Sequence, residues 1–337
     1  MKRVLWVPLV VSLGLLLAAA VGAAGAMTHA RNGKIVFRRY LNADHSVGAI
    51  YTINPDGTGL FRVTHAPLGA LSNEPDPSPN GQWIDYMVEW PNNPHARSQI
   101  FRIRPNGQDR TDLSTSCTGM CGGDGFPDWS TTGWIAFERF QSADFSQPEG
   151  FSSVFIMRPD GSHVHQVTLR DANPAKPAMF EDFAPGWSPS GRQLAFERAN
   201  DVTGLHAIFT VTPNGRALHQ ISPWALDASQ PQYSPSGQWI CFRSHESSNT
   251  TGNIFLVHPD GTGLHRLTHT TPGTGKWLSC AFSPDGRDVV SAKTAVVNGQ
   301  QQNADVYMIP VGGGMPQDVT NDPAHWDSAP DWGTGRS

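Results

Sequence analysis

Short apolar segments recur along the chain, and within them β-branched and aromatic side chains alternate with polar ones. Clear examples are IYTI, IFTV and IFLV at residues 50–53, 208–211 and 254–257. Residues of these types in this alternation are typical of β-strands packed between neighbouring layers. No segment beyond residue 26 shows a sustained helical period. We therefore expect an all-β protein in which helix is nearly absent.

The first of two repeated patterns is an aromatic residue, a Ser-Pro-x-Gly turn and an apolar run. Pro sets φ at the second position of a turn and Gly supplies the positive φ that closes it. Each copy therefore predicts a strand, a tight turn and a second strand. The copies are WSTTGWIAFE (129–138), WSPSGRQLAFE (187–197), YSPSGQWICFR (233–243), FSPDGRDVVSA (282–292) and the weaker PSPNGQWIDYM (77–87).

The second pattern is an alternating strand, Pro-Asp/Asn-Gly, and a strand that ends in Thr or Ser. It predicts the third and fourth strands of the same unit, joined by another hairpin turn. The sixth copy has lost the Pro-Asp-Gly. The copies are AIYTINPDGTGLFRVT (49–64), QIFRIRPNGQDRTDLS (99–114), SVFIMRPDGSHVHQVT (153–168), AIFTVTPNGRALHQIS (207–222), NIFLVHPDGTGLHRLT (253–268) and DVYMIPVGGGMPQDVT (305–320).

The spacing of these units defines the architecture. The glycines of the second pattern are separated by 50, 54, 54 and 46 residues at Gly57, Gly107, Gly161, Gly215 and Gly261. A period near fifty with short strands in each copy is typical of β-propellers. Residues 327–335 match only the first strand of a unit, and residues 33–64 supply only its later strands. We therefore predict one domain over 33–335, a six-bladed propeller of four-stranded antiparallel blades closed by a C-terminal strand.

The first 26 residues have the parts of a secretory signal peptide. Lys2 and Arg3 precede an apolar stretch over 4–24, and Ala24-Gly25-Ala26 is a small-residue cleavage site. The alternative is an uncleaved membrane anchor, since about 21 apolar residues could span a bilayer. In both cases the remainder lies outside the cytoplasm, in the periplasm or secreted. Charged residues make up 16% of the chain without a basic block, which argues against nucleic acid as a partner.

The two patterns resemble the repeat of TolB-like propellers, which also occurs in the propeller domains attached to prolyl-oligopeptidase-type peptidases. The resemblance covers nearly all of residues 33–335. It implies a platform that serves many ends, because a fold does not fix a function. The α/β domain that precedes the TolB propeller has no counterpart between the signal segment and the first strand. The G-x-S-x-G motif of the peptidases does not occur either. These observations favour a monomeric, non-catalytic scaffold that binds a protein or peptide.

The mouth of the channel is the expected binding site, because the innermost strands of a propeller converge there. The position five residues before each aromatic of the first pattern is occupied by Ser72, Asp124, Asp182, Ala228, Trp277 and Asp327. We take Asp124, Asp182, Asp327 and Trp277 as candidate binding residues. Three carboxylates could hold Ca²⁺, which prefers oxygen ligands, or receive a basic peptide group. Alternatively they cap turns through local hydrogen bonds.

An enzyme is the competing interpretation. Propeller lyases that act on pectin fragments share a related repeat and bind a metal through clustered histidines, so the resemblance also implies a metal-dependent polysaccharide lyase or a hydrolase-like activity at the channel mouth. Here many histidines fall on or after the outer strand, where they should point apart around the rim. They are His65, His163, His165, His219, His265 and His269. No catalytic constellation is recognisable.

The four cysteines are expected to play two roles. Cys117 and Cys121 lie in the loop CTGMCGG, where an oxidising compartment favours a local disulfide. Cys241 lies mid-strand at a position where other copies carry alanine, which indicates a small buried residue. Whether Cys241 reaches Cys280 is left open by the sequence.

Further features point to surfaces and to contacts between blades. The pairs Glu138-Arg139 and Glu197-Arg198 occupy matching places in neighbouring units and suggest a charge ladder between blades. The insertions 140–152 and 170–183 would be the most individual surface. Loop tryptophans are a second candidate for a binding face, since loop aromatics often serve in recognition. They are Trp90, Trp224, Trp277 and Trp326.

Overall fold

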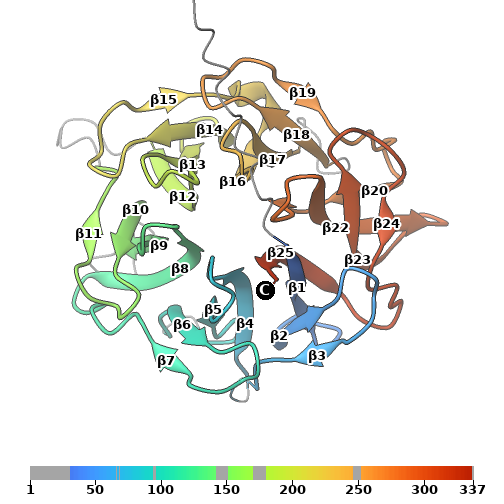
Figure 1. Ribbon diagram of the computed structural model, residues 1–337, viewed down its shortest axis with the longest axis horizontal. Coiled ribbons are helices and arrows are strands. Elements are labelled where there is room, and N and C mark those ends of the chain that lie inside the picture. The colour runs from blue at the N-terminus through green and yellow to red at the C-terminus, as the bar shows by residue number, and fades with distance from the viewer. Residues whose placement is uncertain are drawn as a thin grey trace, which may run out of the picture.

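The chain forms a ring of six β-sheet blades around a central channel, as seen in a computed structural model (Figure 1). The structure describes residues 31–65, 67, 69–93, 96–141, 151–169, 180–245 and 252–335. The six-bladed fold expected from the repeat is confirmed. Within the described ranges the one helical element is the 3₁₀ turn η1 (Trp224–Leu226), and no helix is long and apolar enough to cross a membrane.

Blades one to three follow the chain from its first described residues. In each blade the strands run from the channel outwards. Blade one consists of β25 (Asp327–Thr334), β1 (Asn32–Tyr40), β2 (Gly48–Ile53) and β3 (Phe61–Arg62). Blade two consists of β4 (Leu71–Pro77), β5 (Ile84–Glu89), β6 (Gln99–Ile103) and β7 (Thr111–Asp112). Blade three consists of β8 (Cys121–Trp129), β9 (Ile135–Gln141), β10 (Phe151–Met157) and β11 (His165–Gln166).

Blades four to six repeat this order. Blade four consists of β12 (Phe180–Trp187), β13 (Leu194–Asn200), β14 (Leu205–Val211) and β15 (His219–Gln220). Blade five consists of β16 (Ala228–Tyr233), β17 (Ile240–Ser244), β18 (Asn253–Val257) and β19 (His265–Arg266). In blade six the inner strand is divided, and the strands are β20 (Gly275–Trp277), β21 (Ala281–Phe282), β22 (Asp288–Val297), β23 (Gln300–Pro310) and β24 (Gln317–Asp318).

The ring is closed within blade one, where the last strand pairs with the first. β25 lies antiparallel to β1, with Trp332 opposite Ile35 and Asp327 opposite Arg39. The Trp332 indole N–H donates to the Gly33 carbonyl over 3.1 Å. This closure matches the composite blade expected from the two chain ends, and it leaves neither β25 nor β1 as an open edge for a foreign strand.

The Thr or Ser that ends the second pattern has the same task in all blades. Its hydroxyl oxygen accepts the backbone N–H of a residue in the third strand, over 2.8 to 3.0 Å. In blade three, for example, Thr168 accepts from Val154. The short outer strand makes few ladder bonds, so the hydroxyl satisfies a donor that would otherwise be buried without a partner.

The turns fix how one blade sits on the next. In the first pattern the serine hydroxyl closes its own turn, as where Ser188 accepts the Gln193 N–H over 3.0 Å. In the second pattern Gly161 has φ 80°, and a Cβ there would lie 2.8 Å from the Leu113 carbonyl oxygen of the preceding blade. Glycine is therefore needed both for the turn and for the close approach of two blades.

Apolar side chains pack between neighbouring blades and form the core. One such cluster joins Ala136 and Ile156 of blade three to Trp187, Leu194 and Phe196 of blade four. Each apolar Å² removed from water contributes about 25 cal/mol. A disulfide adds a covalent link between blades five and six, because Cys241 is bonded to Cys280 with 6.2 Å between their Cα atoms.

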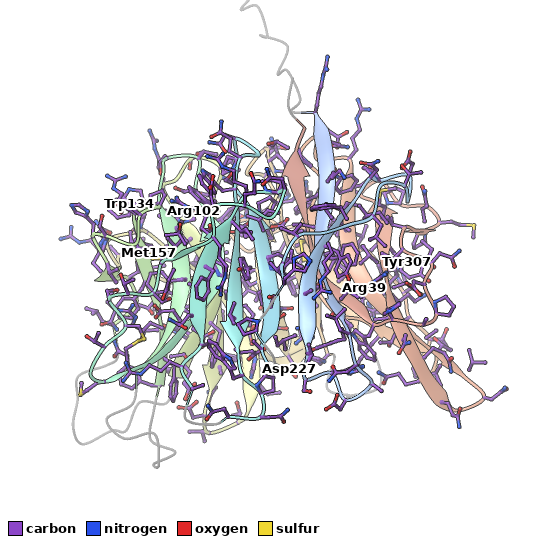
Figure 2. The ribbon with its side chains drawn as sticks, turned by 90° about the horizontal axis from the view of Figure 1, so that it is seen from below. Arg39, Arg102, Trp134, Met157, Asp227 and Tyr307 are labelled. Carbon is purple, nitrogen blue, oxygen red and sulfur yellow. A yellow bond between two sulfur atoms is a disulfide. The ribbon has the colours of Figure 1, made fainter. Side chains whose placement is uncertain are left out.

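The ring has two unlike faces. We call the face with the Ser-Pro-x-Gly and Pro-Asp-Gly turns the turn face. The opposite loop face carries the connections between blades, such as residues 221–227, and the loops between second and third strands, such as 201–204. Figure 2 shows Trp134, which follows a turn, towards one face and Asp227 at the other.

Candidate functional site

The inner strands that line the channel share a bulge at an X-Pro step. In five blades the residue before the proline has a positive φ between 42° and 51°, at Glu74, Phe126, Ala184, Gln230 and Ala329. In all five of these blades the antiparallel register slips there, for example between Gly125 and Asp128. A bulge adds a residue to one strand and re-aims the side chains beyond it. In four blades the residue after the proline lines the channel, as Asp76, Asp128, Gln232 and Asp331, and blade four has Gly186 there.

In three blades the polar side chain at this position ties the inner strand to the next blade. Asp76 accepts the backbone N–H of Trp129 over 2.7 Å, and Asp128 accepts that of Trp187 over the same distance. Gln232 does the same for Phe282 over 2.8 Å. A cavity in the channel between these strands has a free volume of about 90 Å³. Hydrogen bonds in the interior of a protein are stronger than those at the surface because the local dielectric is lower.

Asp331 departs from this pattern. The next blade carries Pro77 where the others have an aromatic residue, and proline has no N–H to donate. Asp331 accepts instead from the Trp332 N–H over 2.6 Å and from the Gln232 amide over 3.2 Å. Burial raises the pKa of Asp331, and the Asp76 carboxyl interacts with it directly. Burial and the neighbouring charges of Asp128 and Asp331 raise the pKa of Asp76 well above its ordinary range.

The three aspartates chosen from the sequence have a different setting. Asp124 is bonded to Arg139 over 2.7 and 2.8 Å, and Asp182 to Arg198 over 2.6 and 2.8 Å. Asp327 holds Arg39 in the same way, with both oxygens at 2.7 Å. Each arginine comes from the second strand of the same blade, so the structure does not bring the three carboxylates together. Burial still raises the pKa of Asp124 against the opposing effect of Arg139.

Trp277 and the loop cysteines lie apart from one another. The Trp277 side chain is buried against Tyr307, edge to face at 5.6 Å, with the Lys293 ammonium 5.0 Å from its ring centroid. Cys117 and Cys121 are joined in a disulfide with 5.1 Å between Cα atoms. Within the described ranges their sulfurs and Asp124 form the one close group of metal-ligand residue types, and a disulfide leaves no thiolate for a metal. Calcium at Asp124, Asp182 and Asp327 stays a prediction of the sequence.

The expected charge ladder between blades is wrong. Arg139 and Arg198 pair with aspartates of their own blades, because those carboxylates lie directly across the strand pair. Their neighbour Glu138 instead accepts the Ser152 hydroxyl over 2.7 Å. Burial and the nearby carboxylates of Glu197 and Glu181 raise the pKa of Glu138 to about 8.

The Glu197 carboxyl has different hydrogen-bond partners from Glu138. One of its oxygens is hydrogen-bonded to the His206 ring, and the other accepts the Gln230 N–H over 3.2 Å. The Glu197 carboxylate raises the pKa of His206. A protonated carboxyl beside a carboxylate–imidazole pair is an arrangement that general acid–base chemistry uses. The insertions 140–152 and 170–183 near these residues lie mostly outside the described ranges.

Comparison with solved structures shows that the fold is a TolB-like β-propeller. TolB from Acinetobacter baumannii matches with a TM-score of 0.65 and 17% identity, over 89% of this chain and 66% of that one. A putative TolB from Agrobacterium tumefaciens matches with 0.60 and 16%, over 89% and 98%. Oligogalacturonate lyase from Vibrio parahaemolyticus matches with 0.52 and 11%, over 85% and 78%. This chain thus spans just under two thirds of the Acinetobacter protein. No protein-family model and no curated protein sequence matches it.

We expect Asp124→Ala to lower the free energy of unfolding by about 3–5 kcal/mol, because Arg139 is left buried without its counter-ion. Asp109→Ala is the matched control, since its pair with Arg104 is exposed and such pairs contribute about 1 kcal/mol or less. Urea denaturation measures both.

Thermal scans of the wild type with and without Ca²⁺ test the calcium prediction. A higher melting temperature with Ca²⁺ would support it, and an unchanged melting temperature would oppose it.

We expect Asp331→Asn to stabilise the ring at pH 8 and to leave it unchanged near pH 4. A folded-state pKa above the unfolded one means that stability is complete below the unfolded pKa and is lost as the pH rises through the folded pKa. An amide cannot ionise, so the variant escapes this loss, which we expect to be about 1–3 kcal/mol. Urea midpoints at both pH values check it, with Asp109→Asn as the surface control. An equal effect at both pH values would contradict the assignment.

Proposed function

We propose that this chain is an exported, non-catalytic scaffold that binds a protein or peptide on its loop face. The observation that carries the proposal is the contrast between the two faces. The turn face repeats nearly identical turns, and a serine hydroxyl closes the inner turn in five blades. Loops between second and third strands instead range from the two residues 298–299 to the nine residues 90–98. Variation confined to one face of a rigid frame is typical of a recognition surface.

The frame suits such a role because it is already ordered before a partner arrives. Inner strands are bonded to their neighbours and the ring is closed by β25 and β1. Binding to a preorganised surface avoids part of the entropy that association otherwise costs. The TolB-like fold gives coarse support in the same direction.

Apolar side chains on the loop face supply contact area. Met120, Leu169 and Val202 are 65%, 76% and 71% exposed. They lie at the edges of blades three and four, the blades that border the insertions 140–152 and 170–183. Exposed apolar residues also lie near the turn face, at Leu60, Leu218 and Met315, so the two faces are compared directly in the experiment below.

A location outside the cytoplasm belongs to the same proposal. It is supported by the signal-like pattern of residues 1–26, which lie outside the described ranges, and by two disulfides. Disulfides persist in oxidising compartments and are rare in the cytosol.

A capture experiment tests the scaffold function. The wild type, immobilised through its C-terminus, is exposed to a cell-envelope extract next to a triple variant, Met120→Asp, Leu169→Asp and Val202→Asp. We expect capture of specific proteins to fall at least tenfold in the variant, because charges at a desolvated contact prevent its burial. The control carries Leu60→Asp, Leu218→Asp and Met315→Asp near the turn face. Equal loss in both variants, or no loss in either, would refute the loop face as the binding surface.

The enzymatic alternative is supported by Glu138, a carboxyl with a raised pKa beside Glu197 and His206, and by the likeness to oligogalacturonate lyase. It predicts that oligogalacturonate incubated with Mn²⁺ and this protein yields unsaturated products that absorb in the ultraviolet. It also predicts that Glu138→Gln abolishes that activity. We expect no turnover above a buffer control, and turnover that Glu138→Gln removes would replace the scaffold proposal.

A further inference from the structure

A small cleft opens at the loop-face end of the channel and is lined by residues of blades one, two, five and six. Its volume is about 250 Å³, less than the usual range for pockets that enclose a drug-sized ligand. Arg38 of β1 and Arg243 of β17 lie on its wall, and so do Glu74, Tyr40, His45 and Trp326. The cleft thus holds two guanidinium groups from blades that are not adjacent in the ring.

Arg38 is held in place by neutral groups. Its Nε and Nη2 atoms donate to the Ser328 hydroxyl over 3.1 and 2.6 Å, and Nη1 donates to the Asn73 side-chain oxygen. The guanidinium carbon lies 4.4 Å from the centroid of the Tyr40 ring. The orientation of Arg38 is therefore fixed while its charge is not neutralised by a direct counter-ion.

Arg243 is fixed in the same manner. Its Nε donates to the Ser229 hydroxyl over 2.6 Å, and Nη1 donates to the Leu278 carbonyl over 3.0 Å. A guanidinium has five N–H groups, and these two hydrogen bonds use two of them. The acceptors of both arginines are hydroxyls, an amide and a backbone carbonyl.

Other arginines on the second strands of the blades differ from Arg38 and Arg243, because they have counter-ions. Arg39, Arg139 and Arg198 each form a two-pronged ion pair with an aspartate of their own blade. Among the described residues neither Arg38 nor Arg243 has a carboxylate within 4.0 Å. Partly buried arginines without counter-ions are suited to receive an anion, and the planar guanidinium matches a carboxylate.

Glu74 is a carboxyl on the cleft wall. Burial raises its pKa, and Arg38 and Arg243 oppose that rise from beyond ion-pair distance. Glu74 is held by its bulge at φ 42° and lines the same cleft as Arg38 and Arg243. A peptide N–H beside a bound carboxylate could donate to it.

Aromatic rings form the outer wall. The His45 ring stacks on Tyr40 at 4.4 Å and meets Trp326 at 4.7 Å with an angle of 59° between the planes. Burial and the nearby Arg38 lower the pKa of His45, so the wall is neutral at pH 7. The two planes make a corner, which suits the alkyl part of a side chain better than the flat face of a sugar ring.

We propose that this cleft binds a carboxylate of a peptide ligand, with Arg38 and Arg243 as its two cationic contacts and the corner of His45 and Trp326 around the adjoining methylene groups. The proposal rests on the binding function argued above and names the chemistry of the ligand. A Glu or Asp side chain and a peptide C-terminus are the two sources of such a carboxylate, and they share the same recognition.

Fluorescence anisotropy with labelled eight-residue peptides tests this. One peptide is amidated and carries glutamate, one carries glutamine with an amidated end, and one carries glutamine with a free C-terminus. We expect a carboxylate-bearing peptide to bind at least tenfold more tightly than the peptide without one, because charge-assisted bonds are lost with the carboxylate. The tighter of the two acidic peptides identifies the source.

Variants locate the contact. Arg38→Gln and Arg243→Gln should each weaken the acidic peptide at least tenfold, whereas Arg192→Gln on the turn face should not change it. Melting temperatures show whether each variant is folded. If Arg38→Gln does not fold, Arg243→Gln and Trp326→Ala carry the test. Weaker peptide binding by both arginine variants, with melting temperatures that show both to be folded, supports the proposal.

Three outcomes would overturn the inference. They are equal binding of the glutamine and glutamate peptides, unchanged binding by both arginine variants, and binding of oligogalacturonate alone. The scaffold proposal is judged separately. If envelope proteins are still captured through the loop face while acidic peptides do not bind, the carboxylate inference fails and the scaffold function stands.

Discussion

The pairing of β25 with β1 is the contact on which the rest of the ring depends. Four blades are built from strands that are neighbours in the sequence and blade six from a divided inner strand and its neighbours, but blade one takes its inner strand from the other end of the chain. Asp327 and Arg39, which are 288 positions apart, repeat there the ion pair that Asp124 and Arg139 make 15 positions apart. The same Asp–Arg ion pair thus joins the first and second strands both in the hairpin of blade three and in the long-range closure of blade one. Closing such a distant pair carries a large loop entropy and is slow.

The inner strands add a second constraint, because they place acceptors where backbone donors of the next blade need them. Asp76 and Asp128 accept backbone N–H groups of the next blade, and burial raises the pKa of both carboxyls. An arrangement of this kind favours one defined packing of blades over maximal stability. Asp331 does not follow this pattern. Pro77 has no N–H to donate, and the Asp331 carboxyl interacts with Asp76 instead.

Much of this architecture could be predicted from the sequence, since the repeats name the strands, the turns and the composite blade. The final Thr or Ser of each unit was part of the pattern, but its bond to the third strand requires the folded sheet. The candidate site was harder to foresee. Counting five residues back from an aromatic assumes regular alternation, and the bulge before Asp128 shifts it. The repeated Pro-Asp before the aromatic, at 127–128 and 330–331, was the available signal for the channel. Arg38 and Arg243 occupy the repeat position of Glu138, and only the fold shows that they border one cleft.

The disulfide between Cys241 and Cys280 also bears on how the protein is prepared. It closes a loop of 39 residues, which loop-entropy arguments value at about 4 kcal/mol. Cys280 is two positions from Leu278, whose carbonyl orients Arg243. A reductant that opens this bond would release the segment 278–280 at the same time as it lowers stability. Protein made in a reducing cytosol would therefore be folded around a looser channel mouth than protein matured in an oxidising compartment. Its melting temperature would report the redox history of the sample.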